Sequence, residues 1–110
     1  MTIRPLNELG REAAQISANH GFSSGVEDID QKLLLAVGEI VEAQNELRTG
    51  HTPQEVYFNA EKPEGFGVEI ADAIIRLAQL TFNLDIDLYA AIALKMRYND
   101  TRPYKHGKQF

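Results

Sequence analysis

The hydrophobic positions along this chain recur at helical spacing and predict four helices. Apolar side chains return every three or four residues, and no stretch alternates strictly between apolar and polar positions as a half-buried strand does. The periodic stretches cover residues 6–19, 28–49, 67–83 and 86–99. Gly21 and Gly50 follow the first and second stretches, and Asp85 can serve as the N-cap of the fourth. We therefore expect an all-α domain built as a four-helix bundle.

The stretch at 67–83 is more apolar than the others. On a helical wheel its aliphatic and aromatic side chains cover most of the circumference and leave a narrow polar arc. That arc consists of Glu69, Asp72, Arg76 and Gln79. A helix so apolar is expected to be largely buried, and a chain of this length offers few helices to cover it. We therefore expect a homo-oligomer, a dimer or a tetramer, in which neighbouring copies complete the core.

A long connection, residues 51–66, joins the second and third stretches. It holds two prolines and the aromatic residues Tyr57 and Phe58. Connections of this length in a small helical domain are usually functional, disordered or part of a subunit contact. The sequence leaves these three interpretations open.

The composition is that of one globular domain over residues 1–110, with 44% hydrophobic and 25% charged residues. The formal net charge of -5 argues against binding to duplex nucleic acid, which needs a broad basic surface. No apolar run approaches ~18 residues, so we expect neither a membrane-spanning helix nor a secretory signal peptide. The absence of cysteine excludes disulfides and thiolate metal sites and is consistent with a cytoplasmic location.

Two pairs of acidic residues are the candidate chemistry of this chain. Glu39 and Glu42 lie three apart in the second stretch, and Glu69 and Asp72 repeat that spacing in the third. Residues three apart on a helix are neighbours, with about 5–6 Å between their Cβ atoms. On antiparallel helices the two pairs could converge into a four-carboxylate pocket, where like charges raise each pKa unless a cation lies among them. Ligation by oxygen alone favours Mg²⁺ or Mn²⁺.

A plainer interpretation stays open at this point. Acids three apart are common on solvated helix faces, where they bind no metal. Glu46 continues the first pair by one turn, and we expect it to be a solvated acid rather than a fifth ligand. Arg76, one turn after Asp72, is expected to be an ion-pair partner that steadies that acid.

The order and spacing of these motifs resemble a known family. The pattern E-x-x-E, 26 residues and E-x-x-D resembles the signature of the MazG-like all-α nucleoside triphosphate pyrophosphohydrolases. The runs 33–39 and 69–76 resemble the sequences that surround the two acid pairs in that family. Lys95, Asn99 and Arg102 are similar to its closing K-x-x-x-N-x-x-R element. The resemblance spans residues 12–108, which is nearly the whole chain.

The resemblance implies one MazG-like domain, completed by oligomerisation, that hydrolyses a nucleoside triphosphate to the monophosphate and pyrophosphate. It implies Glu39 as the base that orients the attacking water. It also implies that Lys95, Asn99 and Arg102 grip phosphates and that Phe22 stacks on the nucleobase. The ligands that it implies for Mg²⁺, with Mn²⁺ as a substitute, are Glu39, Glu42, Glu69 and Asp72.

Other interpretations remain for several of these residues and for the chain. Lys95 suits the C-terminal end of a helix by its charge alone, and Phe22 suits a hydrophobic core. Relatives that act on phosphoribosyl-ATP or dUTP share the resemblance, and the sequence does not choose among the bases. A second interpretation is that the protein is not an enzyme but a non-catalytic helical interaction module whose acid pairs lie on its solvated surface.

Overall fold

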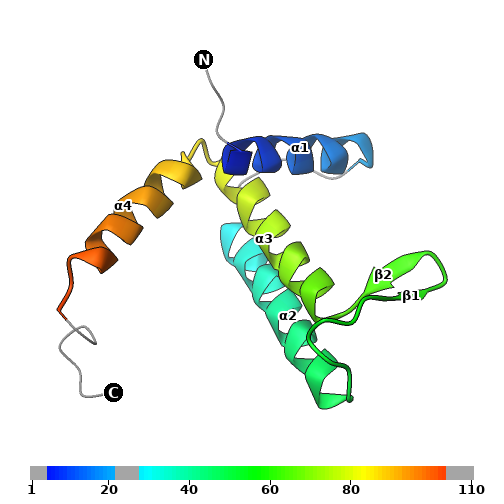
Figure 1. The fold of residues 1–110 in the computed structure, drawn as a ribbon. Coiled ribbons are helices and arrows are strands. Elements are labelled where there is room, and N and C mark those ends of the chain that lie inside the picture. The colour runs from blue at the N-terminus through cyan, green and yellow to red at the C-terminus, as the bar shows by residue number, and fades with distance from the viewer. Residues whose placement is uncertain (1–4, 22–27, 104–110) are drawn as a thin grey trace.

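The computed structural model describes residues 5–21 and 28–103, and this part of the chain is mostly helical (Figure 1). Its elements are α1 (Pro5–Asn19), α2 (Ile29–Arg48), β1 (Tyr57–Asn59), β2 (Lys62–Glu64), α3 (Phe66–Asn83) and α4 (Leu88–Asp100). The bounds of the four helices lie within two residues of those predicted from the hydrophobic pattern. The mostly helical character is therefore confirmed, whereas the four-helix bundle is not, because α4 leads away from the other three helices (Figure 1).

A small β-hairpin inside the 51–66 connection is the element that the hydrophobic pattern missed. β1 pairs antiparallel with β2, with Tyr57 opposite Glu64 and Asn59 opposite Lys62. Each strand is only three residues long, so neither shows enough alternation to be recognised, and Pro63 is tolerated because the strand has an open edge. The connection is thus folded, and the interpretation that it is disordered is wrong.

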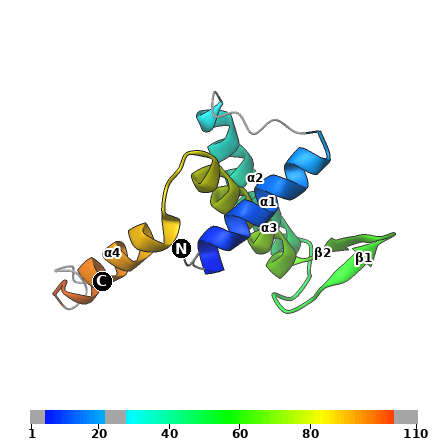
Figure 2. The same ribbon diagram turned by 90° about the horizontal axis from the view of Figure 1, so that it is seen from above.

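Small side chains bring the helices together, and α3 lies at the centre. It packs against α2 on one side and α1 on the other, as Figure 2 shows from above. The buried hydrophobic side chains within the described ranges, all 1–6% exposed, are Ala13, Ala36, Ala43, Ala73, Ala78 and Leu80. Five of these six are alanines, which lets the helix axes approach closely.

Gly10 marks the closest approach between α1 and α3. A Cβ atom at this position would collide with the backbone carbonyl oxygen of Ala78 and would come within 3.0 Å of the Phe82 Cβ. Backbone atoms cannot move aside as the end of a flexible side chain can. Only glycine therefore fits this crossing.

Two helices end in the same hydrogen-bonded motif, although one uses glycine and the other does not. After α2, Gly50 adopts a φ of 98°, and the His51 amide donates to the carbonyl of Glu46 at 3.1 Å. After α3, Asp85 adopts a φ of 59°, and the Ile86 amide donates to the carbonyl of Thr81 at 2.9 Å. The expectation that Asp85 caps α4 is therefore wrong, because this residue terminates α3.

Helix α4 begins at a cap that also ties it to α1. The N-cap is Asp87, whose Oδ1 accepts from the Ala90 amide at 3.0 Å. The same oxygen accepts from Asn7 Nδ2 at 2.8 Å, and the Asn7 side chain in turn accepts from the Tyr89 amide at 3.3 Å. Beyond this joint, α4 leads away from the other helices (Figures 1 and 2).

Much of the apolar surface of this single chain lies open. All residues of α4 are described, and none is buried. In α3 only Ala73, Ala78 and Leu80 are buried, while Ile74, for example, is 47% exposed. The expectation that α3 is largely buried is wrong for one copy of the chain. Within the described ranges no single helix has the length and hydropathy to cross a membrane; α3 and α4 reach it only together, and they are bent by 112°.

We expect Gly10→Ala to lower the free energy of unfolding by about 1–3 kcal/mol, because the added methyl group forces α1 away from α3. Gly38→Ala is the matched control, since Gly38 is also helical and a Cβ there meets no atom within 4 Å. That control should raise stability by about 0.5–1 kcal/mol through helix propensity. Urea denaturation followed by circular dichroism measures both values, and equal effects would contradict the close crossing.

Candidate metal centre

Three carboxylates from two helices converge in this structure. Glu39 of α2 and both Glu69 and Asp72 of α3 each offer one oxygen, and these oxygens all lie within 4.8 Å of one another. We call these three residues the acid group. All three side chains are partly buried, and that of Glu39 is only 17% exposed. Three of the four acids predicted to gather do gather.

The convergence follows from the alanine contacts between α2 and α3. Ala36, Glu39 and Ala43 occupy one face of α2 because residues spaced by three, four and seven share a side of a helix. On α3, the buried Ala73 directly follows Asp72. Because α2 and α3 contact each other through these alanines, the carboxylates beside the alanines also lie at the contact between the two helices.

The acid group is electrostatically costly as it stands. Burial, followed by the hydrogen bond and the negative charge of Glu39, raises the pKa of Glu69 to about 7. Burial and the Glu39 charge also raise the pKa of Asp72, and the Arg76 charge partly opposes this rise. Carboxylates held together at such a cost are a donor set that fits a hard divalent cation.

Arg76 pairs with the acid group across the helix contact. Its Nε lies 3.3 Å from Oε1 of Glu39, so the ion pair joins α3 to α2. The sequence predicted Asp72, one turn earlier on the same helix, as the partner. The Arg76 charge does lower the pKa of Asp72, but the close ion pair forms with Glu39, because periodicity within one helix does not show which residue of a neighbouring helix a long side chain reaches.

Glu42 stands apart from the other three acids. It is exposed, and it is not a member of the acid group, although its charge contributes to the raised pKa of Glu69. Around the helix axis Ala36 and Ala43 lie about 40–60° to one side of Glu39, whereas Glu42 lies about 60° to the other side, away from the face that meets α3. Its role as a metal ligand stays a prediction.

The residues predicted to grip phosphate do not lie with the acid group in one chain. Lys95 and Asn99 belong to α4, which leads away from the α2–α3 pair (Figure 1). Lys95 Nζ and Arg102 Cζ instead lie over the Tyr98 ring, at 4.9 and 5.6 Å from its centroid. Phe22, predicted to stack on a base, lies outside the described residues.

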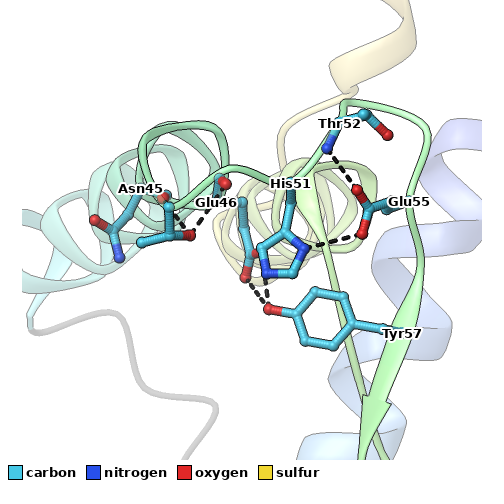
Figure 3. A network of polar contacts seen from close by, with 7 residues as sticks. Asn45, Glu46, His51, Thr52, Glu55 and Tyr57 are labelled. Atoms are coloured by element: carbon cyan, nitrogen blue, oxygen red, sulfur yellow. Dashed lines mark hydrogen bonds and ion pairs between the residues drawn. The ribbon is translucent and has the colours of Figure 1, made fainter.

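A second polar cluster joins the hairpin to the end of α2, as Figure 3 shows. The Tyr57 hydroxyl donates to both carboxylate oxygens of Glu46, at 2.9 and 2.8 Å. His51 Nδ1 contacts Glu55 Oε2 at 2.9 Å, and the His51 and Tyr57 rings stack with centroids 4.4 Å apart. Glu46 raises the pKa of Tyr57 to about 12, and Glu55 raises that of His51.

Glu46 is therefore not the solvated acid that its place in the sequence suggested. Its side chain is 14% exposed and serves as the anchor of the hairpin. The signal was present, since Glu46 lies seven residues after Glu39 and shares its helix face. The hairpin leads directly into α3, so this anchor helps to set where Glu69 lies.

Without a divalent cation, stability should fall as the pH rises from about 4.5 to about 7. The raised pKa of Glu69 means that the folded state holds a proton that the unfolded chain has lost in this window. Glu69→Gln removes the carboxylate charge. At pH 8 in EDTA we therefore expect the variant to have a free energy of unfolding that is higher by about 1 kcal/mol after solvent screening, which raises the Tm by about 4–8 °C. The gain should vanish near pH 4.5.

Thermal unfolding across this pH range measures the effect. Glu61→Gln, at an exposed position in the hairpin turn, is the matched control and should follow the unmodified protein at every pH. If Glu69→Gln kept the same fall in Tm between pH 4.5 and 7, the raised pKa of Glu69 would be wrong.

Comparison with known proteins identifies no relative of this chain. No protein-family model matches the chain, and neither a curated protein nor a solved structure shows significant similarity to it.

Proposed function

We propose that this protein hydrolyses nucleoside triphosphates, ribose or deoxyribose, to the monophosphate and pyrophosphate with the help of Mg²⁺ or Mn²⁺. The observation that carries the proposal is the acid group, in which two helices hold three carboxylates together at an electrostatic cost. Such a cost is relieved by a divalent cation. The order of the sequence motifs, which resembles the MazG-like pyrophosphohydrolases, supports the same chemistry.

The acid group can supply the parts that this reaction needs. A bound divalent cation neutralises charge on the phosphates and makes a bound water more acidic. Glu39, Glu69 and Asp72 would hold that cation, with Glu42 one helical turn away. Glu39 is the proposed base: it takes a proton from water as the water oxygen bonds to phosphorus and the bond to the pyrophosphate oxygen breaks. Arg76, 3.3 Å from Oε1 of Glu39, would orient this carboxylate.

We further propose that the active form is a homo-oligomer. The large hydrophobic side chains left open on one copy include Leu34, 68% exposed, and Leu94 and Met96, 70% and 65% exposed. Open apolar area of this kind is typical of a surface that another chain covers. A second copy could also bring Lys95, Asn99 and Arg102 to the phosphates, which one chain does not.

The same open surface favours a second candidate function. A helical interaction module would use the exposed faces of α2 and α4 to bind another protein, and its acid group would then be structural. The two candidates differ in one observable, because only the enzyme releases pyrophosphate. Substrates beyond ordinary nucleoside triphosphates, such as phosphoribosyl-ATP or dUTP, belong to the enzyme candidate.

The decisive assay measures pyrophosphate released from a panel of nucleoside triphosphates, dUTP and phosphoribosyl-ATP with Mg²⁺ or Mn²⁺. We expect turnover that Glu39→Gln and Asp72→Asn each reduce by about 10²–10⁴-fold, the size associated with losing a positioned base or a charge-stabilising group. Glu61→Gln is the matched control, because this glutamate is exposed in the hairpin turn and lies outside the acid group. Glu42→Gln decides whether the fourth acid takes part.

Folding of every variant is checked by circular dichroism. The absence of turnover on the whole panel, with folded protein, would reject the enzyme and favour the interaction module.

Light scattering at micromolar concentration tests the oligomer. We expect a mass that is a multiple of 12.3 kDa, and we expect Leu94→Glu to lower it while the helical signal is kept. Gln54→Glu adds the same single negative charge at an exposed loop position and is the comparison for effects of net charge. A mass of 12.3 kDa for the unmodified protein would contradict the proposal.

A further inference from the structure

His51 lies where the end of α2, the 51–56 loop and the hairpin meet (Figure 3). Its Nδ1 lies 2.9 Å from Oε2 of Glu55 in the loop, and its Nε2 lies 3.8 Å from Oε2 of Glu46 in α2. Its ring stacks on that of Tyr57 in β1, with 4.4 Å between the centroids. One side chain therefore contacts all three segments.

Both ring nitrogens of His51 face a carboxylate, and this arrangement suits the protonated ring. A neutral imidazole carries one N–H and leaves its other nitrogen as an acceptor, which a carboxylate oxygen cannot satisfy. The protonated ring carries an N–H on each nitrogen and a positive charge that attracts both carboxylates. The contacts of His51 with Glu46 and Glu55 are therefore strongest while the ring is protonated.

The titratable groups around His51 favour its charged form. The hydrogen bond to Glu55 raises the pKa of His51, partial burial opposes this rise, and the charge of Glu55 adds to it. The charges of Glu46 in α2 and of Glu64 in β2 act in the same direction. Tyr57 stays neutral, because its hydrogen bond to Glu46 raises its pKa to about 12. His51 thus keeps its charge below its raised pKa and loses it as the pH rises through that value.

The loop that His51 contacts lies against the start of α3. Gly65 is the N-cap of α3 with a φ of 140°, and a Cβ atom there would collide with the backbone carbonyl oxygen of Glu55. The Glu55 side chain also accepts from the Thr52 amide at 2.8 Å, which holds the loop in this shape. The Gly65 carbonyl in turn accepts from the Glu69 amide at 3.0 Å. His51 is therefore connected through the loop to the helical turn that carries Glu69.

We propose that protonated His51 is a positioning residue for the candidate metal centre: it holds the loop and the hairpin against α2 and so places Glu69 for a divalent cation, and loss of its proton weakens cation binding. This inference rests on the proposed function, in that the acid group must hold the cation. It also adds a dependence on pH. Acidification protonates Glu69 and weakens cation binding, whereas protonation of His51 strengthens it.

Mg²⁺ affinity, measured by calorimetry without nucleotide, tests the proposal. His51→Phe keeps a ring that can stack on Tyr57 but removes both ring nitrogens and the charge. We expect this variant to bind Mg²⁺ about fivefold more weakly than the unmodified protein near pH 6.5, and the two affinities to approach each other near pH 9, where His51 is neutral. Protonation of Glu69 affects both proteins alike, so it cancels in the ratio of the two affinities.

Two matched controls accompany this test. His20, just after α1, is an exposed histidine outside the acid group, and His20→Phe should bind Mg²⁺ like the unmodified protein at every pH. Glu55→Gln removes the charge that raises the pKa of His51, so the advantage over His51→Phe should disappear at a lower pH. Glu61→Gln, at the exposed hairpin turn, should leave that pH unchanged.

An NMR titration of the His51 ring supplies a measurement that needs no variant. Coupled binding equilibria affect each other equally, so Mg²⁺ must raise the pKa of His51 if protonated His51 favours Mg²⁺. Direct repulsion between the two positive charges would lower this pKa instead. A fall or no change overturns the inference, and so does a ratio of affinities for His51→Phe that does not vary with pH.

Neither measurement uses a nucleotide, so the inference and the proposed enzyme fail separately. Mg²⁺ binding that depends on His51 in this way, without pyrophosphate release, keeps the inference and rejects the enzyme. Pyrophosphate release without coupling between Mg²⁺ and His51 overturns the inference and keeps the enzyme. Folded protein that neither binds Mg²⁺ nor releases pyrophosphate overturns both.

Discussion

The close approach of α2 and α3 through alanine side chains is the constraint on which this structure depends. Ala36, Ala43 and Ala73 are almost completely buried, and residues of this size allow two helices to meet with little between their backbones. The approach stabilises the pair by burying apolar area, but it also draws Glu39 out of water beside two acids of α3. The packing of α2 against α3 is therefore opposed by the repulsion among these three carboxylates, and the candidate metal centre lies at this contact.

The same contact explains how three separate features are connected. The face of α2 that carries Glu39 continues one heptad later to Glu46, which anchors the hairpin through Tyr57. The hairpin leads into the first turn of α3, where Glu69 lies. On the other side of α3, Gly10 allows α1 to approach equally closely, and the space left between the three helices forms a groove. Acid group, hairpin anchor and groove thus share one central helix.

A single copy of the chain leaves much of its apolar surface exposed. Its buried core consists mainly of alanine, while larger apolar side chains of α2, α3 and α4 remain open to solvent. Burial of such side chains supplies most of the free energy of folding, at about 25 cal/mol per Å² of apolar surface. Helix α4 contacts α1 through its capped end and has no buried residue, so a single copy supplies little of this free energy along α4.

The sequence by itself determined the four helices within two residues of their bounds, because 3.6-residue periodicity is a local property of the chain. It also predicted that the two acid pairs could converge, because each pair has the same helical spacing, and three of the four acids do lie together. Only the tertiary structure decided that Arg76 pairs with Glu39, that the partly buried Glu46 accepts from the Tyr57 hydroxyl and that Glu42 is exposed. Those outcomes depend on how α2 and α3 are rotated about their own axes. A rotation by about 100°, the angle between successive residues of a helix, changes which side chain lies in the contact.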